Sequence, residues 1–235
     1  MIEPRRTKYK RPLDLVVLTV VHVSLFPIWT TLWMVIPVLI WLEDRGPVFF
    51  VQERVGRDGR MFKFLKFRTM RPRRHHEEWG GSTIQDDPRV TVVGRLLRAR
   101  SLDELPQIIN LWKGEMTLVG PRPLPVDMHR QCVLEDPRFD LRVQVRPGLT
   151  GPAQVYGPRH CPPRLRLRYD LLYMRKASLP LDLQMLVRSV WLTLTGGWGS
   201  RHKNLEIHTA SHMPMTEACR KNACSDNWES RLPRE

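Results

Sequence analysis

The feature that most constrains this chain is an uncharged segment at residues 15–42, in which His22 is the only titratable side chain. The segment is 28 residues long, and about 20 apolar residues suffice to cross a bilayer as a helix. Pro27 lies near its middle, where a proline removes one helical N–H and its ring clashes with the preceding turn. The sequence therefore predicts a membrane helix with its break at Pro27.

Both flanks of this segment are basic. The basic residues before it are Arg5, Arg6, Lys8, Lys10 and Arg11, and those after it include Arg45, Arg54, Arg57, Arg60, Lys63, Lys66 and Arg68. Positive flanks prefer the cytoplasmic side of a membrane, so a simple crossing would place one of them on the wrong side. A helix–break–helix that enters and returns to the same face satisfies both. We favour this re-entrant hairpin over the alternative, a single-pass anchor with an incidental proline.

The chain carries 38 Lys and Arg against 24 Asp and Glu, a formal net charge of +14 in 235 residues. Such a charge suits nucleic acid, anionic lipid headgroups or phosphorylated small molecules. The membrane segment favours the last two, and because no nucleic-acid-binding module is recognisable we expect no nucleic-acid partner. The segment is too long for the apolar core of a signal peptide and no small-residue cleavage site follows it, which indicates a cytoplasmic location for the bulk of the chain.

Two residue patterns suggest metal binding only superficially. The four cysteines are Cys132, Cys161, Cys219 and Cys224. None forms a C-x-x-C pair, so we expect reduced thiols rather than a zinc site. His75 and His76 are adjacent, but they lie in a charged, irregular stretch (71–88) without carboxylates at ligand spacing, and we interpret them as solvated side chains.

The pattern of apolar residues and turn signals predicts an α+β fold that is mainly helical with a small β-hairpin. We expect a strand at 48–51 and a hairpin turn at 57–60. Residues 61–67 are a second strand or a surface element with its basic residues on one side. We expect helices at 90–99, 103–112 and 182–195, and rigid proline turns at 120–123 and 146–152. Asp182 is expected to cap the last helix. That helix is apolar enough to be either core or an interfacial helix with Trp191 at headgroup level.

Three parts follow from this pattern. Residues 1–44 form the basic N-terminus and the re-entrant membrane hairpin. Residues 45–198 form a compact cytoplasmic domain, and residues 199–235 form a polar tail that we expect to be poorly ordered.

The sharpest local feature is the acidic pair Asp103 and Glu104, directly before a predicted helix and close to Pro106. One interpretation is a helix cap alone, because Ser101 and Glu104 have capping-box spacing and Asp is a preferred cap. The other is a site for phosphates, a divalent metal or both, because many cations belong to the surrounding segments: Lys66, Arg68, Arg95, Arg98, Arg100, Arg122 and Arg146. An ionised carboxylate can attack phosphorus, and a second one can hold Mg²⁺.

Short motifs around this pair occur in an order that is specific when taken together. They are KRPLD (10–14), GPVFF (46–50), QERVG (52–56), KFRTM (66–70), DPRVT (87–91), SLDELPQ (101–107), KGEM (113–116), VGPRP (119–123), VRPGLTG (145–151) and AQV (153–155). In this order the chain resembles the bacterial sugar transferases, the monotopic polyprenyl-phosphate phosphoglycosyl transferases. The resemblance covers about residues 10–196. The chain differs from the family pattern at Phe26-Pro27, where Ser-Pro is usual, and at VYGPR (155–159), which replaces a Val-Asn-Gly-Arg run.

The resemblance implies an enzyme at the cytoplasmic membrane, with a catalytic domain on the cytoplasmic face and a re-entrant helix as its anchor. Such an enzyme moves a sugar-1-phosphate from a UDP-sugar to polyprenyl (undecaprenyl) phosphate, the first membrane step of exopolysaccharide, O-antigen or glycoconjugate synthesis. By the same resemblance Asp103 attacks the β-phosphorus, UMP leaves, and the lipid phosphate attacks the resulting phosphosugar-aspartate. Glu104 is the implied Mg²⁺ ligand. The implied phosphate contacts are Lys66, Arg98 and Arg146, with Arg68 and Arg122 as further candidates.

Two other functions are weighed against this one. A membrane-anchored basic scaffold without catalysis explains the charge and the membrane segment, and it predicts that Asp103→Asn changes nothing. A nucleotide-sugar hydrolase that uses the same carboxylates predicts product without a lipid acceptor. Membrane lipids are expected partners in each case. The sugar, the polysaccharide pathway, the polyprenol length and the oligomeric state, with a homodimer among the options, stay open.

Overall fold

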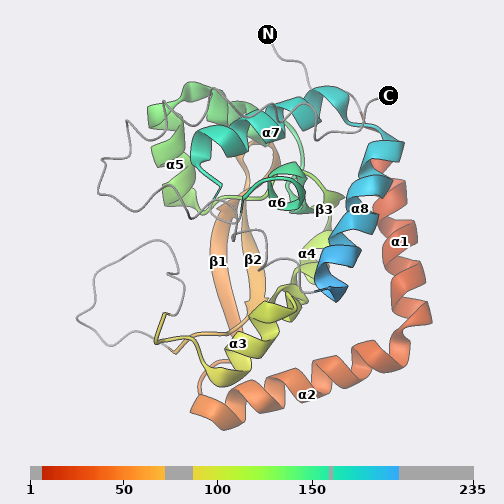
Figure 1. Ribbon diagram of the computed structural model, residues 1–235, viewed down its shortest axis with the longest axis vertical. Coiled ribbons are helices and arrows are strands. Elements are labelled where there is room, and N and C mark those ends of the chain that lie inside the picture. Colours follow the sequence, from red (N-terminus) through yellow and green to blue (C-terminus); the bar gives the residue numbers. More distant parts are fainter. Residues whose placement is uncertain (1–6, 72–86, 159–160, 196–235) are drawn as a thin grey trace.

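The computed structural model describes residues 7–71, 87–158 and 161–195. The predicted tail (199–235), the His75-His76 pair and the cysteines Cys219 and Cys224 lie outside the described residues. The described part is mostly helical with two small sheets, in agreement with the α+β prediction. In Figure 1 the β1–β2 hairpin stands near the centre, α5 and α7 lie toward its upper end, and α2 runs across below its lower end.

The uncharged segment folds into two helices, α1 (Lys10–Ser24) and α2 (Phe26–Asp44), which meet at a sharp bend (Figure 1). The non-helical residue between them is Leu25, with φ −108° and ψ 21°. Pro27 lies in the first turn of α2, so the bend falls just upstream of the residue predicted to break the helix. In the first turn of a helix the N–H groups have no helical partner, so proline costs no hydrogen bond there. Its ring would clash with the turn before it, so α1 cannot continue straight into α2.

α2 is the one helix among the described residues that is long and apolar enough to cross a membrane by length and composition. Its buried side chains are Ile36 and Ile40, while Val38, Trp41 and Leu42 are among the large apolar side chains that it leaves exposed. Exposed apolar surface of this kind marks contact with lipid or with a partner.

The start of α1 is joined to the rest of the molecule by polar contacts. Lys10 donates from Nζ to Asp182 Oδ2 (2.6 Å) and to the carbonyl of Val119 (2.9 Å). Arg11 donates to the carbonyls of Leu111 (2.7 Å) and Trp112 (2.8 Å), at the C-terminal end of a helix where cations are favoured. The KRPLD motif therefore fixes α1 to the domain.

The end of α2 is joined to the same domain by two acidic residues. Glu43 accepts the N–H groups of Val92 (2.6 Å) and Val93 (3.0 Å), which open α3 (Val92–Ala99) and lack helical partners. Asp44 forms a buried ion pair with Arg68, at the end of the hairpin. Both ends of the helix pair are thus held by one domain.

The β-hairpin consists of β1 (Phe49–Val55) and β2 (Met61–Phe67), joined by a 3-10 turn at Arg57–Gly59. The predicted second strand is confirmed. β1 is longer than predicted because its polar residues pair across the hairpin, Glu53 opposite Lys63. Phe62, Phe64 and Phe67 point inward.

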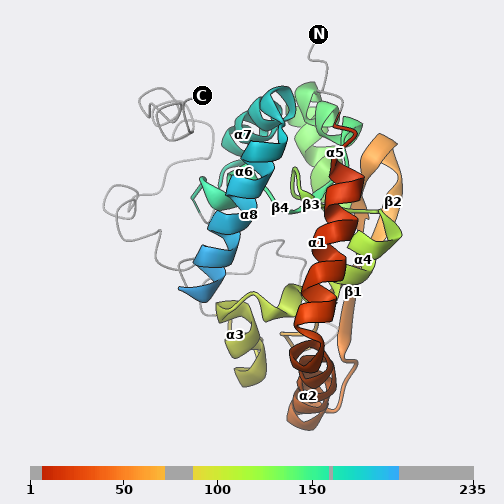
Figure 2. The same cartoon turned by 90° about the vertical axis from the view of Figure 1, so that its right-hand side faces the viewer.

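The rest of the chain is a series of short elements. After α3 come a 3-10 helix at Leu102–Glu104, α4 (Gln107–Lys113), β3 (Thr117–Val119), α5 (Val126–Glu135), a 3-10 helix at Pro137–Gln144, β4 (Gly148–Thr150), α6 (Pro152–Val155), α7 (Pro163–Lys176) and α8 (Leu179–Leu194). The strands β3 and β4 form a parallel pair, with α1 and α8 on either side (Figure 2). The main core collects side chains from both ends of the chain, from Leu18 of α1 to Met185 of α8.

Three local predictions are wrong. The helix expected at 103–112 begins only at Gln107, because a 3-10 turn precedes it. The proline turn at 146–152 contains β4, a strand too short to show alternation. Asp182 does not cap α8, which begins at Leu179; its carboxylate is 1% exposed and is used by Lys10, Tyr9 and Tyr173.

Candidate active site

The acidic pair lies in the 3-10 turn Leu102–Glu104, between α3 and α4. The turn opens at Ser101, whose φ of 55° is left-handed, and Ser101 makes no side-chain capping bond. The capping-box interpretation is therefore wrong, because the Glu104 carboxylate points to cations instead. The turn holds Asp103 8% exposed, at the edge of the core.

Two cations meet the pair. Lys66 Nζ lies 2.7 Å from Glu104 Oε1 and 3.3 Å from Asp103 Oδ2, so one ammonium bridges both carboxylates. Arg122 donates from Nη1 to Glu104 Oε2 at 3.2 Å and from Nη2 to Glu104 Oε1. Such a two-point guanidinium contact fixes the direction of a carboxylate as well as its charge. The structure thus brings four predicted site residues together: Lys66, Asp103, Glu104 and Arg122.

The two carboxylates differ in how fully they are used. Burial by itself raises the pKa of Glu104, but the Arg122 guanidinium and the Lys66 ammonium outweigh it and hold that pKa below its ordinary value. Glu104 accepts three of the roughly four hydrogen bonds that a carboxylate can take. Within the described residues, Asp103 accepts the single long contact from Lys66. Asp103 therefore keeps the larger share of unused oxygen lone pairs.

The local sequence explains how these side chains converge. Lys66 is near the end of β2 and lies opposite Phe50 in the hairpin register. The ring of Phe64, two residues earlier and fully buried, lies 5.7 Å from Lys66 Nζ and 5.9 Å from the Arg122 guanidinium. Phe64 is not among the predicted site residues, although the alternation of residues 61–67 carries the signal. An aromatic face stabilises cations next to it.

The other predicted phosphate contacts occupy different positions. Arg68 is 7% exposed and pairs with Asp44 of α2, so the structure does not bring it to the acidic pair. Arg98 of α3 donates from Nε to Thr69 Oγ1 at 2.8 Å. Arg146 is half-buried just before β4, and within the described part of the chain no acidic partner holds its guanidinium. The roles assigned to these three arginines stay predictions.

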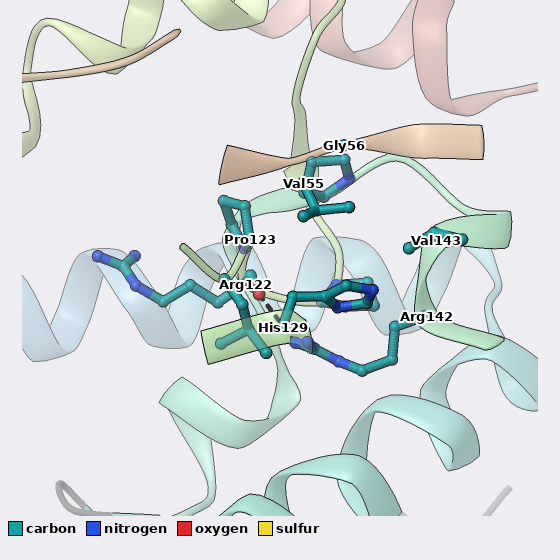
Figure 3. A pocket seen from close by; sticks show the side chains of 10 residues that line it. Val55, Gly56, Arg122, Pro123, His129, Arg142 and Val143 are labelled. Carbon is teal, nitrogen blue, oxygen red and sulfur yellow. Dashed lines mark hydrogen bonds between the residues drawn. The ribbon is translucent and has the colours of Figure 1, made fainter. Parts of the chain in front are cut away.

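A small pocket lies behind the turn that carries Arg122, not at the acidic pair. Its volume is about 20 Å³, room for one water molecule, and neither Asp103 nor Glu104 lines it. Figure 3 shows the main chain of Arg122 in its wall, while the guanidinium points away from the ring of His129 on the opposite side. The pocket is too small for a nucleotide or a sugar.

Tyr156 belongs to the VYGPR run, where the sequence departs from the family pattern. Its side chain is 8% exposed and lies beneath the guanidinium of Arg188 of α8, 4.7 Å from the ring centre. At this position of the run, Tyr156 therefore packs the end of α6 against α8. Arg159, in the same run, lies outside the described residues.

Comparisons with known proteins agree with the motif order. A family model described as bacterial sugar transferase matches residues 5–196. The exopolysaccharide production protein ExoY of Sinorhizobium fredii is 36% identical over 195 residues, which are 77% of this chain and 83% of that protein. The UDP-glucose:undecaprenyl-phosphate glucose-1-phosphate transferase of Caulobacter vibrioides is 40% identical over 194 residues, 79% of this chain and 70% of that protein.

Some relatives are much longer. The UDP-N-acetylgalactosamine-undecaprenyl-phosphate N-acetylgalactosaminephosphotransferase of Aeromonas hydrophila is 40% identical over 179 residues, which are 74% of this chain but only 42% of that protein. The shared region carries the acidic pair and its two cations, and the family model extends over nearly all described residues. The resemblance predicted from the motifs is confirmed: this chain belongs to the bacterial sugar transferase family.

Proposed function

We propose that this protein transfers a sugar-1-phosphate from a UDP-sugar to undecaprenyl phosphate and releases UMP, as an early membrane step of exopolysaccharide synthesis. The observation that carries the proposal is the acidic pair in its 3-10 turn: Glu104 accepts three hydrogen bonds from two cations, whereas the buried Asp103 is largely unused. The names of the Caulobacter and Aeromonas relatives supply the donor and acceptor classes.

In the proposed reaction an oxygen of Asp103 attacks the β-phosphorus of the UDP-sugar. A bond forms between that oxygen and phosphorus, and the bond from phosphorus to the bridging oxygen breaks, with its electron pair leaving on UMP. An oxygen of undecaprenyl phosphate then attacks the same phosphorus and returns the carboxylate to Asp103. The covalent route separates one difficult displacement into two, each in line with a fixed nucleophile or leaving group.

The cations suit this chemistry because every reacting partner is anionic. Lys66 and Arg122 are held by Glu104 and lie near Asp103, so these cations reduce the repulsion between the Asp103 carboxylate and a diphosphate. We include Arg98 and Arg146 as further phosphate contacts. Glu104 in this scheme is an anchor that holds Lys66 and Arg122 at the reacting centre, as well as a metal ligand.

Mg²⁺ is the cofactor that we propose for the site. The donor atoms fit, because Mg²⁺ prefers oxygen and is commonly held by one or two carboxylates together with substrate phosphates. Asp103 and Glu104 are the two carboxylates at the site, with unused lone pairs mainly on Asp103. Bound there, the ion would neutralise charge on the donor diphosphate and on the departing UMP.

We further propose that α1 and α2 form a re-entrant hairpin and that the domain lies on the cytoplasmic face. Lys10 at the start of α1 and Asp44 at the end of α2 are both bound to the same domain, which supports an entry and exit on one side of the membrane. In a single crossing these two ends would lie on opposite sides. The exposed apolar side chains of α8, among them Val187, Trp191 and Leu194, would rest at the same interface.

The test is UMP release by nanodisc-held protein with Mg²⁺ and a panel of UDP-sugars, with and without undecaprenyl phosphate. We expect lipid-dependent release that is lost in Asp103→Asn and retained in Asp127→Asn, the same chemical change at an exposed helical aspartate. Release without lipid would favour a hydrolase. Full activity in Asp103→Asn would refute the covalent route, and a folded protein inert with every donor would favour the scaffold.

A further inference from the structure

The turn that carries Arg122 is held with unusual completeness. Residues 120–125 contain prolines at 121, 123 and 125, each with a fixed φ and no N–H to pair. Because its prolines cannot donate hydrogen bonds, this turn is held mainly through hydrogen bonds that its carbonyl groups accept. Two of them accept main-chain donors: Pro121 from Gly148 N (2.9 Å) and Leu124 from Val55 N (3.1 Å).

The two carbonyls between these accept guanidinium groups. Arg142 donates from Nη2 to the carbonyl of Arg122 at 2.8 Å, the bond drawn in Figure 3. Arg54 donates from Nη1 to the carbonyl of Pro123 at 2.9 Å. Four consecutive carbonyls are thus held by four donors from two parts of the chain, the end of β1 and residues 142–148, and two of the donors are arginine side chains.

Each of these arginines is itself fixed on its other side. Arg142 is 6% exposed and donates from Nε to Asp170 Oδ2 of α7 at 2.7 Å, and Asp170 is 1% exposed. Arg54 binds Gln52 Oε1 twice, at 3.0 and 3.2 Å, and its guanidinium lies 3.8 Å from the centre of the Phe64 ring. A planar guanidinium can stack and fork in this way, whereas a lysine cannot.

The Phe64 ring links this support to the acidic pair. Arg54 stacks on the ring, and Lys66 and Arg122 lie at 5.7 and 5.9 Å from its centre. Burial and the neighbouring Arg122 lower the pKa of Arg54 to about 9, which still leaves it charged at neutral pH. Its positive charge repels the Arg122 guanidinium, which is held by two hydrogen bonds to Glu104.

We propose that Arg54 and Arg142 are positioning residues for the transfer reaction: they clamp the main chain of Arg122, and through Arg122 they orient Glu104 and the cations beside Asp103. The proposal rests on the proposed function for its kinetic test. Neither arginine needs to touch a substrate. A displacement of about 1 Å at a reacting centre can cost roughly a hundredfold in rate, so a loosened turn has a measurable effect.

The kinetic test is a double-mutant cycle with Arg54→Met and Arg122→Met. We expect Arg54→Met alone to lower kcat about 10- to 100-fold, and to lower it by less than about threefold more when Arg122 is already methionine. Arg54→Lys should recover little, because it restores the charge without the stack and the fork. Arg57→Met, an exposed arginine on the same hairpin, is the matched control and should match the wild type. Additive losses in the double variant would overturn the proposal.

A second measurement does not depend on activity. In a crystal structure of Arg54→Met we expect the Arg122 guanidinium to lie more than 4 Å from Glu104, beyond an ion pair; an unchanged contact would overturn the clamp. If the wild type releases no UMP, the proposed function fails, and the crystal structure of the variant alone tests whether Arg54 clamps the main chain of Arg122. If Arg54→Met fails to fold, Arg142→Lys replaces it in both tests, because it keeps a cation for Asp170 and removes the planar fork that reaches Arg122.

Discussion

The buried carboxylate of Asp182 is the contact by which α8 holds the start of α1. It accepts hydrogen bonds from Lys10 (2.6 Å), Tyr173 (2.6 Å) and Tyr9 (3.0 Å), and it is 1% exposed. Asp182→Asn keeps the shape and removes the charge. Lys10, whose side chain is 15% exposed, would then lose the carboxylate with which it forms an ion pair and keep only the weaker attraction of Asp14. Breaking a buried pair in this way costs about 3–5 kcal/mol.

For a chain of this length each kcal/mol lowers Tm by about 2–4 °C, so we expect Asp182→Asn to unfold roughly 10 °C below the wild type. The assay is thermal unfolding followed by circular dichroism in one nanodisc preparation. Adding Lys10→Met should recover most of the loss, because an apolar side chain replaces the unpaired charge. Arg57→Met, which removes half of an exposed pair, should change stability by less than about 0.5 kcal/mol.

The loss should also depend on pH, with a definite sign. Burial lowers the pKa of Lys10 and Asp182 opposes that shift, so the variant lowers it further. A lysine whose pKa is lower in the folded state gains relative stability as pH rises toward its ordinary value of 10.5. The deficit of Asp182→Asn should therefore shrink in alkaline solution. A Tm within about 2 °C of the wild type at neutral pH would refute the assignment of this contact as a stabilising anchor.

Three further predictions concern the site and its supports. Glu104→Gln should lower kcat about 100-fold while leaving the fold intact, because a neutral amide cannot hold Lys66 and Arg122 as the carboxylate does. Steady-state UMP release measures kcat, and an unchanged value would contradict the anchoring role of Glu104. Burial raises the pKa of Glu104, but Arg122 and Lys66 outweigh burial, and the net pKa is lowered. The ionised carboxylate therefore contributes its full stabilisation above the ordinary pKa of 4.5 and loses it only as pH falls through the lowered pKa. The Tm difference between wild type and Glu104→Gln should accordingly be constant near neutral pH and become smaller in acid. Gly94→Ala should cost about 1–3 kcal/mol in a denaturant titration, because the added Cβ would meet the main-chain carbonyl of Thr69, which cannot rotate away; equal midpoints would show that α3 shifts freely.

Several parts of this fold could be predicted because they depend on local pattern. The alternation of residues 61–67 is typical of a strand, and the uncharged run with its proline predicts two helices with a break close to Pro27. The order of the motifs predicts the family, which the comparisons confirm. The division into the parts 1–44, 45–198 and 199–235 stays a prediction.

Other features could not be predicted because they arise from contacts between distant segments. Nothing in the neighbourhood of Asp182 distinguishes a helix cap from a counter-ion, since its partner Lys10 is 172 positions away. The sequence does not distinguish Arg68 from the neighbouring cations Lys63 and Lys66. Arg68 pairs with Asp44 only because α2 lies next to the end of the hairpin. β3 and β4 are three residues each and exist as strands only because they pair with one another.

The candidate site shows the same division. The sequence contains the acidic pair Asp103 and Glu104 and the cations of the motifs. It is equally compatible with the interpretation that the pair is only a helix cap. Tertiary structure excludes the cap: it brings Lys66 from the hairpin to both carboxylates and Arg122 from a proline turn to Glu104. The sequence by itself determined the uncharged N-terminal segment, the net charge and the family, because each depends on residue type and order. Which cation meets which carboxylate depends on distances across the folded core, and these exist only in three dimensions.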